Sequence, residues 1–175
     1  MSEFDLPLRL AKFSQPRGIG RGCAMNVISW ELGEKVISDQ PRGIDGFLGS
    51  LVRQINDLYC SHLVDGLLCP PCSQKVLYLA HLLVGLKITN VNDLEWMLSG
   101  YEWSYSNGGE SSRGSFSGCG VVIPQLTSAL EWNKEHAYQI VLDIIQRVRN
   151  KQGLSPDPTV SPETTQRALA EMRKS

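Results

Sequence analysis

The chain has 175 residues, enough for one domain with a real core, because a domain of about 150 residues buries about 70% of its unfolded surface. Its 17 basic and 18 acidic residues leave a net charge of −1, which disfavours non-specific nucleic-acid binding, since that binding needs excess positive charge. No apolar run approaches the roughly 18 residues of a membrane span, and the N-terminus lacks a signal-peptide pattern, so we expect a cytosolic protein.

The first segment, residues 1–22, is predicted to be an extended arm, because its second half is rich in Pro, Gly and Arg and cannot hold a helix. A short helix is predicted over residues 23–32, and Gly33 would end it. The clearest helix follows from Ile44 to Tyr59, where apolar residues keep the spacing of one helix face. Asp45 is expected in its first turn, where negative charge suits the helix dipole.

Four further helices are predicted along the chain. Residues 76–86 are apolar nearly all round and predict a central buried helix. A short helix through Leu98 would end at Gly100, and Pro124 opens a long helical region that runs to Lys151. The fold class is therefore mainly α, a single-domain helical bundle with its core in residues 23–152, followed by a linker and a short helix over residues 153–175.

Residues 100–120 interrupt the helical pattern with Gly, Ser and aromatic residues. Aromatic residues alternate before an Asn107-Gly108 pair, which predicts a hairpin-like insertion. Tyr, Trp, Ser and Gly are also typical of adaptable binding loops. The predicted anchors of such a loop are Tyr101, Trp103, Tyr105, Arg113 and Phe116. The alternative is a surface excursion whose aromatic rings fold back onto the helices.

Four potential metal ligands lie within thirteen residues: Cys60, His62, Cys69 and Cys72. Three thiolates and one imidazole can form a closed tetrahedral site, so structural zinc is the predicted cofactor. A redox pair of Cys69 and Cys72 is an alternative, because Cys72 immediately precedes the predicted helix and a helix N-terminus lowers the pKa of a thiol. Ordinary buried thiols are the third interpretation.

The residues from Cys23 to Asn90 resemble a known group. The shared features are Cys23-Ala24-Met25, Gly33-Glu34, Ser38-Asp39-Gln40-Pro41, an apolar helix ending in Asn56-Asp57, and a second helix from Val76 to Gly85. This order resembles a group of small uncharacterised helical proteins of actinobacteria and their phages. The resemblance implies a bacterial or phage origin and a helical core, and it implies no catalytic role. The chain departs from the group at Gln40, where His is common.

No Walker loop, dinucleotide-binding fingerprint or His-Glu-x-x-His motif occurs in the chain. We therefore expect a non-enzymatic interaction or regulatory protein with a protein partner, for example one encoded by a phage and directed at a host or defence protein. The alternative is a small thiol, redox or other enzyme that uses Cys69 and Cys72, or the region of Cys23, Glu34 and Asp39.

Overall fold

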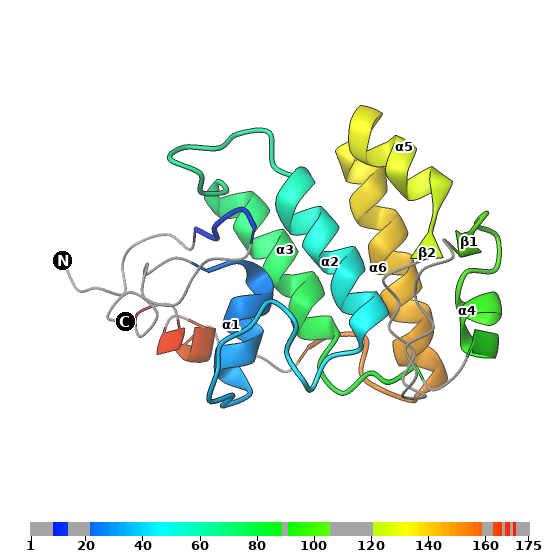
Figure 1. Cartoon of the computed structure of the whole chain (residues 1–175), viewed down its shortest axis with the longest axis horizontal. Helices are drawn as coiled ribbons and strands as arrows, with labels where there is room; N and C mark the ends of the chain where they lie inside the picture. Colours follow the sequence, from blue (N-terminus) through cyan, green and yellow to red (C-terminus); the bar gives the residue numbers. More distant parts are fainter. Residues whose placement is uncertain are drawn as a thin grey trace.

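Helices build most of the described chain, as the sequence predicts (Figure 1). A computed structural model describes residues 9–13, 22–88, 91–105, 121–158, 163–165, 167, 168 and 170. The elements are α1 (Ala24–Glu31), α2 (Gly46–Leu58), α3 (Pro70–Leu82), α4 (Val91–Met97), β1 (Ser104–Tyr105), β2 (Val121–Val122), α5 (Pro124–Trp132) and α6 (Lys134–Lys151). None of the described helices has both the length and the apolarity that crossing a membrane requires.

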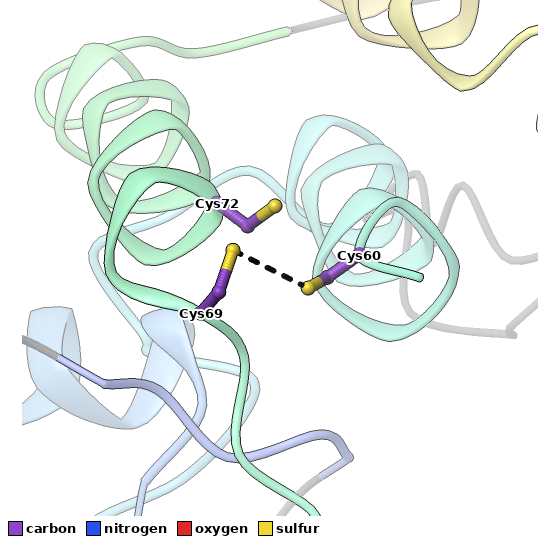
Figure 2. A group of neighbouring side chains, drawn as sticks. All are labelled: Cys60, Cys69 and Cys72. Atoms are coloured by element: carbon purple, nitrogen blue, oxygen red, sulfur yellow. Dashed lines mark hydrogen bonds between the residues drawn. The ribbon is translucent and has the colours of Figure 1, made fainter. Parts of the chain in front are cut away.

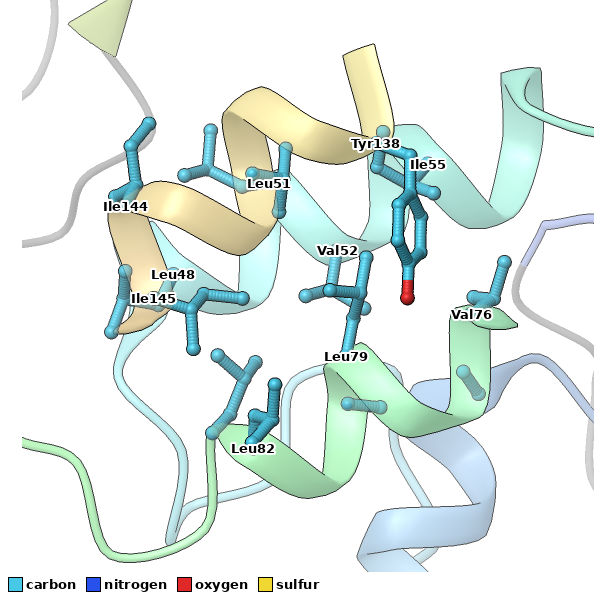
Figure 3. Close-up of a cluster of buried hydrophobic side chains, with 14 of the residues drawn as sticks. Leu48, Leu51, Val52, Ile55, Val76, Leu79, Leu82, Tyr138, Ile144 and Ile145 are labelled. Carbon is cyan, nitrogen blue, oxygen red and sulfur yellow. The ribbon is translucent and has the colours of Figure 1, made fainter. Parts of the chain in front are cut away.

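The core lies between α2, α3 and α6, whose apolar faces meet in Figure 3. Spacing of three and four residues places the apolar side chains of α2 on one face, where they are buried against the other two helices. Burying one such side chain contributes about 1.5–3 kcal/mol. The residues drawn are Leu48, Leu51, Val52, Ile55, Val76, Leu79, Leu82, Tyr138, Ile144 and Ile145. This packing sets the end of α2 beside the start of α3.

Two helix starts differ from the sequence prediction. Asp45 lies one position earlier than expected, as the N-cap of α2, where its carboxylate accepts hydrogen bonds from the backbone N–H groups of Phe47 and Leu48. Helix α3 begins at Pro70, six residues before the predicted start. Prolines fit the first turn of a helix, because the N–H groups there need no helical partner. Cys72 therefore lies inside the first turn of α3 and not before it.

The predicted long helical region after Pro124 is two helices. The helix is interrupted at Asn133, whose backbone leaves the helical region with φ −148° and ψ 83°. Its side-chain oxygen accepts a hydrogen bond from the backbone N–H of His136 at 3.0 Å, so Asn133 is the N-cap of α6. The prediction of one continuous helix is wrong here, because an Asn cap starts a new helix without any proline or glycine.

The insertion contains a strand pair, but β1 pairs with residues further along the chain than a tight turn at Asn107-Gly108 would allow. Ser104 pairs with Val122 and Tyr105 with Val121 in an antiparallel ladder. A tight turn at Asn107-Gly108 would have paired β1 with the residues directly after it. The connection between the two strands spans residues 106–120, which lie outside the described part of the chain.

Residues 9–13 of the predicted arm lie against the loop between α2 and α3. Leu10 is fully buried, and its backbone N–H donates to the Ser73 hydroxyl at 2.9 Å. The Arg9 guanidinium donates to the carbonyl oxygens of Val64 and Leu68 at 3.2 Å each. This segment therefore fixes one side of the loop that carries the candidate metal ligands.

Polar groups tie the C-terminal helical residues to α1. Glu31, the last residue of α1, accepts a hydrogen bond from the Thr165 hydroxyl at 3.0 Å through Oε1. Its Oε2 lies 2.7 Å from His81 Nε2 on α3. Ala168 is also buried in the core. The described C-terminal helical residues thus lie beside α1, where Figure 1 draws them in red.

Candidate metal centre

Three cysteines from two helix ends converge on one point. Cys60 lies two residues after α2, Cys69 is the N-cap of α3, and Cys72 is the third residue of α3. Their sulfur atoms all lie within 4.8 Å of one another. Figure 2 shows them turned toward each other, and the Cys60 thiol donates a hydrogen bond to the Cys69 sulfur at 3.8 Å. Three cysteines are thus close enough to hold a metal ion.

The loop between the helices explains why these sulfurs meet. Asp65 and Gly66 both have positive φ, 55° and 73°, and form the turn that reverses the chain. Val64 and Leu67 close this turn with two backbone hydrogen bonds at 3.1 and 3.0 Å. The loop therefore returns to the same end of the bundle and brings Cys60 against Cys69.

The three thiols differ in their surroundings. Cys60 is 4% exposed, while Cys69 and Cys72 are partly exposed. Hydrogen bonds from the backbone N–H and the thiol of Cys72 lower the pKa of Cys69, and the Cys60 thiol adds to this effect. Burial, followed by the hydrogen bonds with Cys69 and Cys60, raises the pKa of Cys72. Cys69 is therefore more readily anionic than Cys72 when the cluster holds no ion.

A polar network next to the cluster cysteines in the sequence joins the end of α2 to α3 and α6. Lys75, one turn after Cys72, lies 2.7 Å from Glu135 Oε2 and donates to the Tyr59 hydroxyl at 2.9 Å. Its ammonium also lies over the rings of Tyr59 and Tyr138, 5.5 and 5.2 Å from their centroids. The hydrogen bond from Lys75 lowers the pKa of Glu135 to about 2. The positive charge of Lys75 is therefore already matched by a carboxylate.

His62, the fourth predicted ligand, is exposed in the loop after Cys60. The group whose donor atoms lie within 4.8 Å of one another contains the three cysteines without it. The part of the chain that the structure describes holds no other such group of three His, Cys, Asp or Glu residues. The predicted set of four is thus present as three converging sulfurs with an imidazole nearby in sequence.

The described structure does not bring Cys23, Glu34 and Asp39, the alternative predicted site, together into one reactive site. Cys23 is buried, and burial raises its pKa to about 11, so the thiol is protonated at neutral pH. Glu34 accepts hydrogen bonds from the Ser29 hydroxyl and from the backbone N–H of Arg42. Asp39 pairs with Arg53 at 3.7 Å and lines a cavity of about 180 Å³ that neither Cys23 nor Glu34 reaches. The two carboxylates hold the loop before α2.

The predicted binding-loop residues fall in different places. The Tyr101 hydroxyl donates to Asp143 Oδ2 on α6 at 2.8 Å, and the Arg147 guanidinium lies 5.4 Å from its ring centroid. Trp103 is partly buried against the core. The backbone of Tyr105 belongs to β1. Arg113 and Phe116 lie outside the described residues. Their role as anchors stays a prediction.

Sequence reasoning did not find the network of Tyr59, Lys75 and Glu135. Its members are 16, 60 and 76 positions apart, so no local spacing connects them. It also missed Trp132, which is 85% exposed at the end of α5, because this tryptophan lies off the apolar face of that helix and belongs to no motif. Comparisons of the chain with family models, with curated proteins and with solved structures found no match.

Proposed function

We propose that the protein is a non-enzymatic metal-binding protein in which Cys60, Cys69 and Cys72 hold a structural zinc ion. The observation that carries this proposal is the convergence of three sulfurs within 4.8 Å. Two sulfurs bound tetrahedrally to zinc at about 2.3 Å lie about 3.8 Å apart. The Cys60 and Cys69 sulfurs are 3.8 Å apart, so this pair needs little movement to bind.

The bound ion would join the end of α2 to the start of α3. Thiolate ligands favour zinc among the abundant divalent ions, and a structural zinc site has four ligands. His62 is the candidate fourth ligand, because it lies in the exposed loop two residues after Cys60. In this proposal the zinc-bound protein binds a protein partner. The exposed indole of Trp132 supports such a role, since tryptophan is enriched at the centres of interfaces.

Zinc binding should depend on the cluster cysteines. We expect one zinc ion per chain, and Cys69→Ser should weaken zinc binding at least about 100-fold, because even residues that only orient a ligand contribute 10–100-fold. Native mass spectrometry would count the ions, and titration against a chromophoric chelator would measure the Kd.

Cys23→Ala is the matched control, since it removes a buried cysteine outside the cluster and should leave zinc affinity unchanged. His62→Ala tests the fourth ligand and should weaken binding by about 10–100-fold. Zinc affinity of Cys69→Ser equal to that of the wild type would refute the proposal.

A second candidate is thiol–disulfide exchange, favoured by the lowered pKa of Cys69 at the N-cap of α3, with the Cys72 thiol close to it. Cys69 would attack a low-molecular-weight disulfide and release one thiolate. Cys72 would then attack the Cys69 sulfur, release the second thiol and leave an intramolecular disulfide. Two protein thiols are oxidised and one external disulfide is reduced to two thiols.

This candidate predicts different products for two proteins exposed to glutathione disulfide without metal. Cys60→Ser, in which Cys72 is the remaining cluster thiol beside Cys69, should lose two thiols and gain no mass from glutathione. The double variant Cys60→Ser/Cys72→Ser should instead accumulate a stable mixed disulfide on Cys69. Intact-mass spectrometry after an acid quench separates these products. Equal and slow modification of both proteins would exclude a resolving role for Cys72.

A further inference from the structure

The cluster provides three donors of a single kind. Within the described residues, the three sulfurs form their group without a nitrogen or oxygen ligand. Zinc requires a fourth ligand to complete its tetrahedron. Trivalent arsenic and antimony require only three, because a lone pair occupies the fourth direction. The ligand number of the cluster thus fits a trivalent ion without any contribution from His62.

The charge of the complex points the same way. Three thiolates with a divalent ion carry a net charge of −1, while three thiolates with a trivalent ion are neutral. Cys60 is 4% exposed, and an uncompensated charge is costly in such surroundings. Lys75 is already paired with Glu135 at 2.7 Å. Arg9 directs its guanidinium to backbone carbonyls of Val64 and Leu68. A neutral complex needs neither cation.

The cluster is also open to solvent on one side. Cys69 and Cys72 are partly exposed, so a small neutral molecule can reach their sulfurs from solvent. Figure 2 shows the third sulfur, that of Cys60, facing the same point from the end of α2. We infer that this cluster binds trivalent arsenic or antimony as a three-thiolate complex. The inference rests on the proposed function only in taking the three sulfurs as a joint set of ligands.

Binding is a substitution without a change of oxidation state. Arsenite is present at neutral pH as arsenous acid, which has three As–O bonds. Each cysteine sulfur replaces one hydroxyl group, so three As–S bonds form and three As–O bonds break. The three thiol protons leave with the three hydroxyl groups as three water molecules. Both sides of this reaction are neutral.

The test is a titration of the reduced, metal-free full chain with sodium arsenite. We expect one arsenic atom per chain in the native mass spectrum, with a mass that corresponds to the loss of three waters. Cys60→Ser, Cys69→Ser and Cys72→Ser should each weaken binding at least about 10-fold. Cys23→Ala and His62→Ala should bind arsenite as the wild type does.

A measurement on the wild type avoids any folding defect of the variants. Iodoacetamide labelling followed by peptide mapping should show that arsenite protects Cys60, Cys69 and Cys72 together. Protection of only two of these cysteines, or loss of only two waters, would overturn the three-thiolate complex. Failure to bind arsenite would overturn the inference as well.

Zinc titrations of the same proteins separate this inference from the proposed function. Zinc binding without arsenite binding would leave the structural zinc site standing and refute the trivalent site. Arsenite binding without zinc binding would support the trivalent site and refute structural zinc. If neither ion binds, the three cysteines are not a set of ligands and both fail.

Discussion

Replacing Glu31 with alanine should lower the free energy of unfolding by about 3 kcal/mol, because it breaks a buried polar contact from one side. The carboxylate is 11% exposed and lies between His81, 6% exposed, and the buried hydroxyl of Thr165. Alanine would leave the imidazole and the hydroxyl inside the protein without this partner, and each such group costs about 1–3 kcal/mol. Urea unfolding followed by circular dichroism would measure the change.

Thr165→Val is the matched control for Glu31→Ala. Valine keeps the shape of threonine and removes only the hydroxyl that donates to Glu31 Oε1. We expect a loss of about 1 kcal/mol. In the double variant the two losses should not add, because both residues belong to one contact. A stability of Glu31→Ala within about 0.5 kcal/mol of the wild type would show that the contact does not stabilise the fold.

Replacing Arg149 with methionine should lower the free energy of unfolding by a similar amount, about 3 kcal/mol, because hydrogen bonds from a charged donor contribute about 1.5–3 kcal/mol each. The side chain is 6% exposed and donates to the carbonyl oxygens of Leu82 and Ser155, both at 2.7 Å. Leu82 ends α3, so the guanidinium satisfies a free carbonyl at the negative end of that helix dipole. Methionine preserves the apolar part of the packing.

Arg147→Met is the control for Arg149→Met, on the same helix and half a turn away. Its side chain is 34% exposed, pairs with Asp143 at 2.8 Å and donates to the Ser99 carbonyl at 2.6 Å. Solvent screens this pair, so we expect a loss of about 1 kcal/mol or less. Equal losses at the two positions would mean that burial of Arg149 adds nothing to its contribution. The same urea experiment compares both variants.

Local patterns predicted the helices where the apolar spacing and the end signals agree. In α2 the apolar face predicted the helix, and its observed start differs from the expected one only by the place of Asp45, which caps the helix where the first turn was expected. In α3 the two signals disagree, because Cys-Pro-Pro-Cys looks like a turn and yet opens the helix. After Pro124 the apolar stripe continues across Asn133, so spacing alone does not reveal that one helix ends and another begins there.

In the candidate site, too, the sequence predicts what is local and not what depends on distant contacts. Cys60, Cys69 and Cys72 lie close together in the sequence, so their cluster is a local feature that spacing can predict. The position of His62 depends on the turn at Asp65 and on the contacts of Arg9 with the loop. Those contacts join residues 55 or more positions apart, and no periodic pattern encodes them. The contact of Glu31 with Thr165 is beyond local reasoning for the same reason.

The separation of 134 positions between Thr165 and Glu31 also bears on the order in which the protein folds. Helices α5 and α6 are joined by one residue and can pair as soon as both form, because their loop is short. Glu31 and His81 are both synthesised well before Thr165. A nascent chain can therefore pack α1 against α3 before the Thr165 hydroxyl is there to donate its hydrogen bond to Glu31. We therefore expect the C-terminal helical residues to dock last, and to be able to detach while the rest of the bundle stays folded.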